Sequence, residues 1–430
     1  MDWAYIFATA VLAAAALSSN AAAQPAAGRG GRGGPAVVSP EISADGHVTF
    51  RILAPDANKV TFLDNDFGPM LSAGGPGPIA GSTTPAVPAG LRVPQGGITF
   101  TKNQNGIWEA SFGPLPPGAY RYALQVDGVR VLDPVNTRIS ESNTMLWNLF
   151  SVPGSPLMDT RDVPHGAVAS VFYYSAVLKT TRRMHIYTPP GYEAGSRKYP
   201  VFYLLHGAND TDDAWPSVGR ACFILDNLLA DKKIKPMIVV MPAGHQPGQT
   251  GIRGATARSG DASAVNPFTS EFMTDIVPYV QKYYRTIPDR QHRAIAGLSM
   301  GGSQTLDIAF RHLDMFAYVG VFSSGATLGG GRRGPAAPAT GSAPPATPAR
   351  PPRPDWEAVH KADLGNPAMK KGLKLIWLST GVDDGLITNT RSTVEMLKKH
   401  GFEPVFKESA GAHSWFNWRN YLIEFAPQLF

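Results

Sequence analysis

The sequence is poor in cysteine and in charge. Cys222 is the single cysteine among 430 residues, so no disulfide can form within the chain. It lies in a helical apolar pattern, and we expect it to be buried and inert. Only 17% of the residues are charged and the net charge is +6. Because Lys and Arg are scattered rather than gathered on one helix, nucleic acid is not expected as a partner.

The N-terminal apolar run is too short to span a membrane. It covers residues 6–17, about half of what a spanning helix needs. Ala21, Ala22 and Ala23 follow it, a small-residue pattern typical of signal-peptide cleavage sites, although Asp2 stands where a positive charge is usual. We therefore expect residues 1–23 to be a signal peptide and the protein to be secreted or periplasmic, with an uncleaved anchor as the alternative.

Three stretches rich in Gly, Pro or Ala contain few large apolar residues. Such stretches cannot bury enough surface to repay the entropy of ordering. Residues 24–36 are interpreted as a flexible lead-in and residues 68–97 as a long loop. Residues 325–354 are interpreted as a disordered surface insertion. Because this insertion follows an expected core strand, a mobile lid over the active site is the functional alternative.

Residues 37–152 alternate between apolar and polar side chains over short runs bounded by turns. This pattern predicts antiparallel strands, and Asp127-Gly128 between the last two predicts a tight hairpin. We therefore expect a small β-sandwich domain. The expected strands cover residues 47–53, 59–63, 106–112, 119–126 and 129–132.

Beyond Gly154 the apolar runs are continuous and alternate with helical patterns, after leading antiparallel strands at residues 169–189. Strands that are apolar throughout predict a mostly parallel sheet with helices on both faces, in an α/β domain over residues 160–430. Ser270 is a candidate helix N-cap and Gly401 a candidate helix stop. The later strands are expected at residues 199–205, 237–241, 294–296, 318–322, 373–378 and 404–407, and the helices at 222–231, 270–284, 303–312, 391–400 and 416–425.

Residues 297–301 read Gly-Leu-Ser-Met-Gly, between an apolar strand pattern and a helical pattern. A serine raised above a sheet needs a very sharp strand-to-helix turn, and glycines two residues away on each side leave room for it. Ser299 is therefore the candidate nucleophile. A Gly/Ser loop without function is the alternative for such a short motif.

A serine nucleophile needs a base and an acid that orients this base. His413 lies in a small-residue loop after the expected strand at 404–407 and before the last helix. Asp383 and Asp384 both follow the strand at 373–378, and either could be the acid. The order serine, aspartate, histidine is that of α/β-hydrolases.

Ester cleavage also needs donors for the developing oxyanion. In this fold one backbone N–H follows the nucleophile, here Met300, and the other lies on the loop after an early strand, here Ala208. Gly207 permits close approach of that loop. We interpret His206 as a loop residue that supports the oxyanion hole.

These motifs resemble the esterase D-like group, which includes feruloyl and acetylxylan esterases of carbohydrate esterase family 1, enterochelin esterases and mycolyltransferases. The resemblance covers residues 160–430, and its Gly-x-x-Asp pattern implies Asp384 as the acid. The insertion at 325–354 departs from it. The matching motifs are residues 203–209 (YLLHGAN), Trp215, and residues 274–279 (TDIVPY), 297–302 (GLSMGG), 381–384 (GVDD) and 411–415 (GAHSW).

The N-terminal domain resembles the immunoglobulin-like early-set domains related to glycogen-binding modules. The matching segments are residues 54–57, 114–122 and 126–129. Such modules bind glycans through exposed aromatic side chains, for which Phe67 and Trp147 are the nearest candidates. A purely structural domain packed on the enzyme is the alternative.

Together these resemblances imply a secreted serine ester hydrolase that acts on feruloyl or acetyl esters of plant cell-wall xylan. Trp215 and Trp415 would stack on the substrate, and His206 would also contact it. The alternative for the two tryptophans is packing in the core. The alternatives are a siderophore esterase using Arg220, Arg253 and Arg258, an acyltransferase, and a non-catalytic glycan-binding protein. No metal or cofactor is implied, since neither zinc-ligand spacing nor a phosphate-cradling loop is present.

Overall fold

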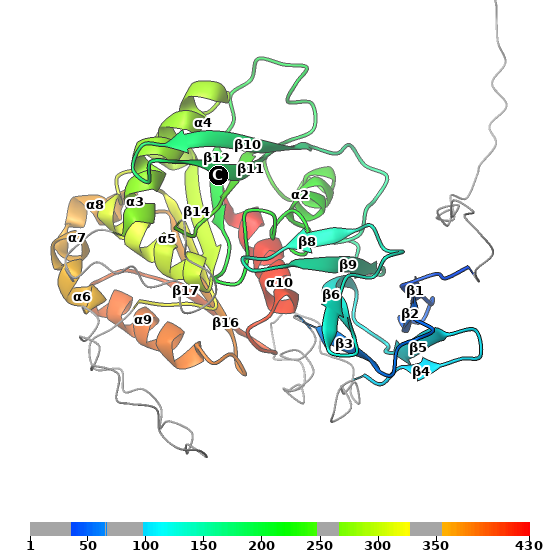
Figure 1. Cartoon of the computed structure of the whole chain (residues 1–430). Coiled ribbons are helices and arrows are strands. Elements are labelled where there is room, and N and C mark those ends of the chain that lie inside the picture. Colours follow the sequence, from blue (N-terminus) through cyan, green and yellow to red (C-terminus); the bar gives the residue numbers. More distant parts are fainter. Residues whose placement is uncertain (1–35, 65, 67–97, 247–265, 327–354) are drawn as a thin grey trace, which may run out of the picture. The chain divides into compact units, whose positions relative to one another are not determined.

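The computed structural model describes residues 36–64, 66, 98–246, 266–326 and 355–430 (Figure 1). The expected signal peptide, almost all of the lead-in, the loop at 68–97 and residues 327–354 of the insertion lie outside the described residues. The described residues from Val37 onward belong to one unit. Among the described helices, none is both long and apolar enough to cross a bilayer.

The N-terminal part consists of two antiparallel sheets that share one hydrophobic core. Phe50, Trp108, Tyr122 and Phe150 come from both sheets and pack in this core. One sheet has the order β1-β2-β5-β4, and the other has the order β3-β6-β9-β8 with β7 on β6. The strands are β1 (Glu41–Ile42), β2 (Val48–Leu53), β3 (Val60–Asp64), β4 (Thr101–Lys102), β5 (Ile107–Phe112), β6 (Gly118–Val126), β7 (Val129–Val131), β8 (Ile139–Glu141) and β9 (Leu146–Val152).

The hairpin predicted at Asp127-Gly128 is present between β6 and β7, where Val126 pairs with Val129. Both turn residues have positive φ, 45° at Asp127 and 86° at Gly128, as a type I′ turn requires. The Asp127 carboxylate also accepts a 2.7 Å hydrogen bond from the backbone N–H of Lys59. It thereby ties the hairpin to the start of β3.

The C-terminal part is built on an eight-stranded mixed sheet. Its order is β10-β11-β13-β12-β14-β15-β16-β17. β11 is antiparallel to both of its neighbours, β10 and β13, whereas the six strands from β13 to β17 in this order are parallel to one another. This is the mostly parallel sheet that the continuous apolar runs predicted. The strands are β10 (Ala167–Ser175), β11 (Thr180–Thr188), β12 (Val201–Leu205), β13 (Ile238–Pro242), β14 (Arg293–Leu298), β15 (Tyr318–Phe322), β16 (Leu375–Gly381) and β17 (Val405–Ser409).

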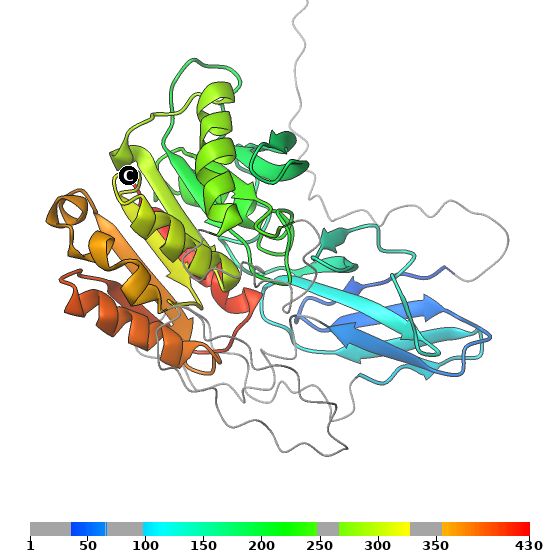
Figure 2. The ribbon, with the colours of Figure 1, turned by 60° about the vertical axis from the view of Figure 1, so that its left-hand side comes forward.

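Helices cover both faces of this sheet. Residues of α2 and α10 pack in the core on one face, and residues of α3, α4, α5 and α9 pack on the other. Figure 2 shows α5 and α9 in front of the sheet and α10, in red, behind it. The helices are α2 (Ala221–Ala230), α3 (Pro267–Glu271), α4 (Val277–Tyr283), α5 (Met300–Arg311), α6 (Trp356–Val359), α7 (Lys361–Gly365), α8 (Pro367–Lys371), α9 (Ile387–Lys399) and α10 (Trp415–Phe425).

The helix expected from Ser270 begins earlier than predicted. Its N-cap is Asn266, whose side chain accepts from the Phe268 N–H, and Pro267 occupies the first helical position. A π-helical segment, Phe272–Ile276, joins α3 to α4. The Ser270 prediction was therefore wrong, whereas Gly401 does follow the end of α9 with a φ of 74°.

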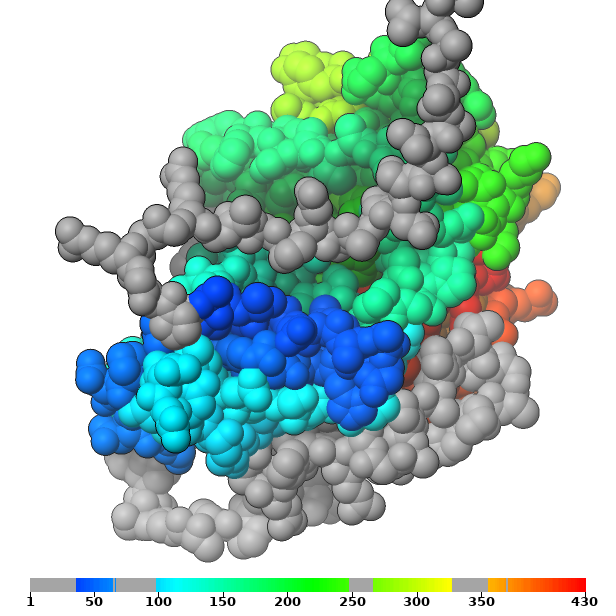
Figure 3. Space-filling view, turned by 90° about the vertical axis from the view of Figure 1, so that its right-hand side faces the viewer, coloured from blue at the N-terminus to red at the C-terminus, as the bar shows by residue number. Residues whose placement is uncertain are grey.

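Buried residues connect the two parts. Ala119 and Leu149 of the N-terminal sheets pack in the core that contains α2 and α10, and Phe416 of α10 packs in the N-terminal core. In Figure 3 the surface of the N-terminal sheets, in blue and cyan, adjoins the green surface of the following strands. The N-terminal sheets therefore contribute to the same packing that supports the C-terminal sheet.

Candidate active site

Ser299 occupies the turn between β14 and α5. Its backbone has φ 51° and ψ −115°, a region that a residue with a side chain rarely adopts. The turn is crowded, because a Cβ on Gly297 would lie 2.4 Å from the backbone of Gly301, and one on Gly301 would lie 2.5 Å from the His206 carbonyl oxygen. The glycines of the motif are therefore required by space, and Ser299 is held at the end of a buried strand.

Ser299, His413 and Asp384 form one chain of hydrogen bonds. His413 Nε2 lies 2.9 Å from Ser299 Oγ, and His413 Nδ1 lies 3.1 and 3.0 Å from the two carboxylate oxygens of Asp384. The three residues come from three different strand ends, after β14, β16 and β17. This is the geometry in which an imidazole can take the proton of a serine hydroxyl.

The structure distinguishes the two adjacent aspartates. Asp384 is 2% exposed and accepts a 2.8 Å hydrogen bond from the Leu386 N–H in addition to that of His413. Asp383 is exposed. Burial alone would raise the pKa of Asp384, but the hydrogen bond and the charge of His413 outweigh it and lower this pKa below the ordinary value. Asp384 therefore carries the negative charge that can orient and stabilise a protonated His413.

The loop after β12 lies directly beside Ser299. A Cβ on Gly207 would lie 2.6 Å from Leu298 Cδ1 and 3.5 Å from Ser299 Cβ, so any side chain there would require Leu298 to shift. Ala208 and Met300 are both half-buried. As the first residue of α5, Met300 has an N–H without an intrahelical acceptor. The structure thus brings both predicted oxyanion donors to the side of the candidate nucleophile.

His206 is buried beneath this loop. The Gly244 N–H donates to its Nε2 at 2.8 Å, so Nδ1 carries the proton and donates to the Gly207 carbonyl oxygen, also at 2.8 Å. Burial lowers the pKa of His206, which keeps the ring neutral. Because the Gly207 C=O and the Ala208 N–H belong to one peptide plane and point in opposite directions, His206 fixes the direction of the Ala208 N–H. It is 2% exposed and supports the loop, so its inclusion among the substrate-contacting residues was wrong.

The two predicted substrate-stacking tryptophans are core residues. Trp215 and Trp415 are 1% and 2% exposed, and their rings pack edge-to-face at 5.0 Å. The indole N–H of Trp215 donates to the Leu205 carbonyl oxygen at 3.1 Å. Neither ring has a free face for a ligand, so that prediction was wrong and the core-packing alternative holds.

Two residues near the site were missed in the sequence. Trp418, on the first turn of α10, packs edge-to-face on the His413 ring with 5.0 Å between the ring centroids. Ser324, just after β15, donates to the Ser299 carbonyl oxygen at 2.6 Å. The i, i+5 spacing from His413 to Trp418 and the serine pair after a core strand are the only sequence signals for them, and both are weak.

The other candidates lie elsewhere or outside the described residues. Trp147 is 8% exposed, with Arg130 over its ring at 4.7 Å, so it offers no open platform for a sugar. Phe67, Arg253 and Arg258 lie outside the described residues. Among the residues that the structure does describe, no three His, Cys, Asp or Glu side chains are grouped so that they could hold a metal ion.

Comparison with known families agrees with this geometry. The esterase family model, described as "Putative esterase", matches residues 175–429, which is more than half of the chain. The chain belongs to the esterase family. The matched region contains all three residues of the hydrogen-bonded chain.

Curated relatives extend the likeness into the N-terminal part. The chain is 28% identical over 405 residues to an endo-1,4-beta-xylanase/feruloyl esterase of Xylanibacter ruminicola, covering 91% of this chain and 46% of the relative. It is 30% identical over 149 residues to endo-1,4-beta-xylanase Y of Acetivibrio thermocellus, covering 32% and 12%. The chain thus spans less than half the length of these two relatives.

Solved structures share the fold. A CE1 ferulic acid esterase from Anaeromyces mucronatus, in complex with ferulic acid, aligns with a TM-score of 0.50 and 23% identity over 65% of this chain and 96% of its own. The enterobactin esterase from Shigella flexneri, in the presence of enterobactin, aligns with a TM-score of 0.56 and 14% identity over 89% and 92%. The C-terminal part therefore has the α/β-hydrolase fold of these esterases.

Proposed function

We propose that this protein is a serine carboxylic-ester hydrolase, with feruloyl or acetyl esters of plant cell-wall xylan as its substrates. The observation that carries the proposal is the hydrogen-bonded chain from Asp384 through His413 to Ser299, at the end of a strand where Ser299 adopts a positive φ. The xylan-ester substrate is supported by the likeness to the endo-1,4-beta-xylanase/feruloyl esterase of Xylanibacter ruminicola, which matches 91% of the chain.

In the first half-reaction, His413 Nε2 takes the proton of Ser299 Oγ as this oxygen attacks the ester carbonyl. Asp384, which is kept ionised by its low pKa, holds the imidazole and stabilises its positive charge. The N–H groups of Met300 and Ala208 donate to the oxyanion of the tetrahedral intermediate. The protonated His413 then gives its proton to the leaving alcohol oxygen, which leaves an acyl group on Ser299.

In the second half-reaction, a water molecule replaces the alcohol. His413 removes one of its protons as it attacks the acyl carbonyl, and the same two N–H groups receive the second oxyanion. Ser299 leaves with the proton returned by His413, and the carboxylic acid is released. The neutral His206 acts only by holding the peptide of Gly207 and Ala208 in place.

The proposed organisation assigns residues 1–23 to a signal peptide and 24–36 to a linker, so that the enzyme is secreted or periplasmic. Residues 37–152 form an early-set type domain and residues 160–430 the esterase domain, interrupted by the insertion at 325–354. Within the described part of residues 37–152 no aromatic side chain is exposed. We therefore do not assign this domain a glycan-binding platform of stacked aromatic rings.

The substrate class is tested by hydrolysis rates measured side by side. Methyl ferulate, an acetylated xylo-oligosaccharide and ferric enterobactin should be compared, with Ser299→Ala as the matched inactive control. We expect turnover of one or both of the first two substrates. Efficient cleavage of ferric enterobactin alone would replace the xylan-ester assignment by a siderophore esterase. Acyl transfer to an added sugar acceptor in place of hydrolysis would indicate an acyltransferase.

A further inference from the structure

A cavity of about 340 Å³ lies between the N-terminal sheets and the segment that follows β12. Arg138 of the N-terminal part lines it together with Asp213, Ser217, Arg220 and Phe223 of the C-terminal part. None of these residues belongs to the proposed triad or oxyanion hole. The cavity is therefore a separate place where a ligand could contact both parts of the chain.

Arg220 is anchored at one side of this cavity with donors to spare. It is 5% exposed and its guanidinium lies over the Phe223 ring at 4.2 Å. It donates to the Met158 carbonyl oxygen, to Ser151 Oγ and to Thr160 Oγ1. Since an arginine side chain has five N–H donors, about two remain for a ligand.

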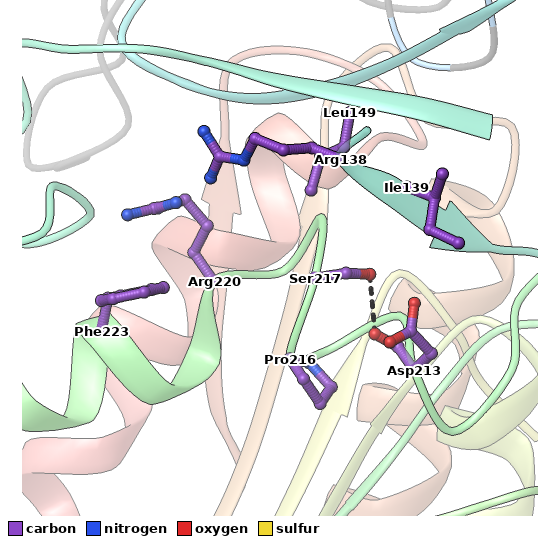
Figure 4. A pocket seen from close by; sticks show the side chains of 8 residues that line it. All are labelled: Arg138, Ile139, Leu149, Asp213, Pro216, Ser217, Arg220 and Phe223. Carbon is purple, nitrogen blue, oxygen red and sulfur yellow. Dashed lines mark hydrogen bonds between the residues drawn. The ribbon is translucent and has the colours of Figure 1, made fainter. Parts of the chain in front are cut away.

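Arg138 supplies a second guanidinium on the same side, as Figure 4 shows. Its side chain is exposed, and within the described residues its guanidinium has neither a hydrogen-bond acceptor nor a carboxylate partner. Burial, together with the nearby charge of Arg138, lowers the pKa of Arg220 to about 10. Asp159 offsets part of this effect, but the two guanidinium groups at this end of the cavity still form a site that an anion would stabilise.

The other side of the cavity is different in character. In Figure 4 Asp213 and Ser217 lie away from the two arginines. The Asp213 carboxylate accepts a 3.0 Å hydrogen bond from the Glu141 N–H, and Ser217 Oγ donates to the Asp213 carbonyl oxygen at 2.7 Å. The Asp213 carboxylate and Ser217 Oγ can accept hydrogen bonds from the hydroxyl groups of a ligand. The cavity therefore pairs an anion-binding end with an end suited to hydroxyls.

We propose that this cavity binds an acidic sugar, with the carboxylate on Arg138 and Arg220 and the ring hydroxyls toward Asp213 and Ser217. Its volume suits one sugar ring, and guanidinium groups bind carboxylates through paired hydrogen bonds. The identity of the ligand as part of a polysaccharide rests on the proposed function. Binding itself does not require Ser299, so it can be measured independently of ester cleavage.

The test is titration calorimetry of the purified full chain with sodium D-glucuronate, D-glucose and inorganic phosphate. Arg138→Ala and Arg138→Glu remove and reverse the exposed charge, and Lys59→Ala is the matched control because Lys59 is an exposed cation of the same part. We expect glucuronate to bind at least about tenfold more tightly than glucose. Arg138→Ala should weaken this binding about tenfold or more, Arg138→Glu should abolish it, and Lys59→Ala should leave it unchanged.

Several results would overturn the inference. Equal affinities for glucuronate and glucose would show that no anion is recognised. Unchanged glucuronate binding in Arg138→Glu, with a melting temperature equal to that of the wild type, would place any binding elsewhere. Phosphate binding as tight as that of glucuronate, and equally lost in Arg138→Ala, would leave an anion site but contradict the acidic sugar as its ligand. All of these outcomes are measured as binding, so they would keep their meaning even if the protein hydrolysed none of the esters tested.

Discussion

Ser299 and His413 share one proton across a 2.9 Å hydrogen bond, so neither is effective without the other. Replacing either residue by Ala should lower kcat roughly 10⁴-fold or more, and the double variant should be little slower than the slower single one. Initial rates on methyl ferulate would measure this. Losses that multiply in the double variant would show that the two residues do not act as one unit.

The two neighbouring aspartates allow a matched comparison. Asp384→Asn keeps the shape of the side chain but removes the charge that holds the His413 tautomer, so kcat should fall by about 10³- to 10⁴-fold. Asp383→Asn changes an exposed carboxylate and should alter kcat less than about twofold. A larger loss from Asp383→Asn than from Asp384→Asn would reverse the assignment.

The catalytic candidates could be predicted from the sequence because each carries a local signal. Ser299 has glycines on both sides, and His413 and Asp384 follow strand patterns in the expected order. Trp215 and Trp415 could not be placed in this way, since an aromatic residue in a loop after a strand can face either a ligand or the core. Only the three-dimensional packing, which turns each ring against the other, decides between them.

At the scale of elements, the loops after β12 and β13 place two buried histidines side by side. The rings of His206 and His245 lie 5.4 Å apart. Burial and the charge that His206 would carry lower the pKa of His245 to about 4. Protonation therefore favours the unfolded chain, in which the pKa is about 6.5, and stability should fall as the pH drops from 6.5 toward 4.

This pH dependence is testable by urea denaturation across that range. The His245 contribution should reach about 3 kcal/mol between these limits, and His245→Phe, which keeps a ring beside His206, should remove that part of the slope. Replacing His47, whose side chain is 43% exposed, in the same way is the control for the loss of a histidine elsewhere in the chain. An identical slope for His245→Phe and the wild type would contradict the account.

The sequence patterns predicted the core strands and the long helices, because continuous apolar runs and helical periodicity are strong signals. The short helices α6, α7 and α8 and the strands β8 and β9 were not predicted. Segments of three to seven residues contain too few positions for a period to be detected. The cap at Asn266 was missed because Ser270, four residues later, fits the same rule equally well. The immunoglobulin-like character of the N-terminal sheets and the signal peptide stay predictions.

At the scale of the whole molecule, one buried ion pair links the N-terminal sheets to the loop that carries Ala208. Arg121 is 0% exposed and donates to Asp210 at 2.7 Å, and its guanidinium lies 5.7 Å from the Trp415 ring. The Asp210 N–H in turn donates to the Gly207 carbonyl oxygen at 3.1 Å. The N-terminal part thus contacts both the oxyanion loop and the start of α10, next to His413.

Arg121→Met should leave the Asp210 carboxylate buried without a partner and lower the free energy of unfolding by about 3–5 kcal/mol. Arg51→Met is the matched control, because Arg51 pairs with exposed Glu41 and Glu109, and it should cost about 1 kcal/mol or less. Adding Asp210→Leu to Arg121→Met should restore part of the loss. Equal effects of the two arginine replacements in urea denaturation would show that the buried pair does not join the two parts.

The most direct test of the central claim is mass spectrometry after treatment with an activated aryl phosphonate, which forms a stable adduct with an activated serine. The account predicts one phosphonyl group per chain, on the peptide that contains Ser299, formed together with the loss of methyl ferulate hydrolysis. His413→Ala should react far more slowly. Labelling of a different serine, or full hydrolytic activity in a chain labelled at Ser299, would contradict the account.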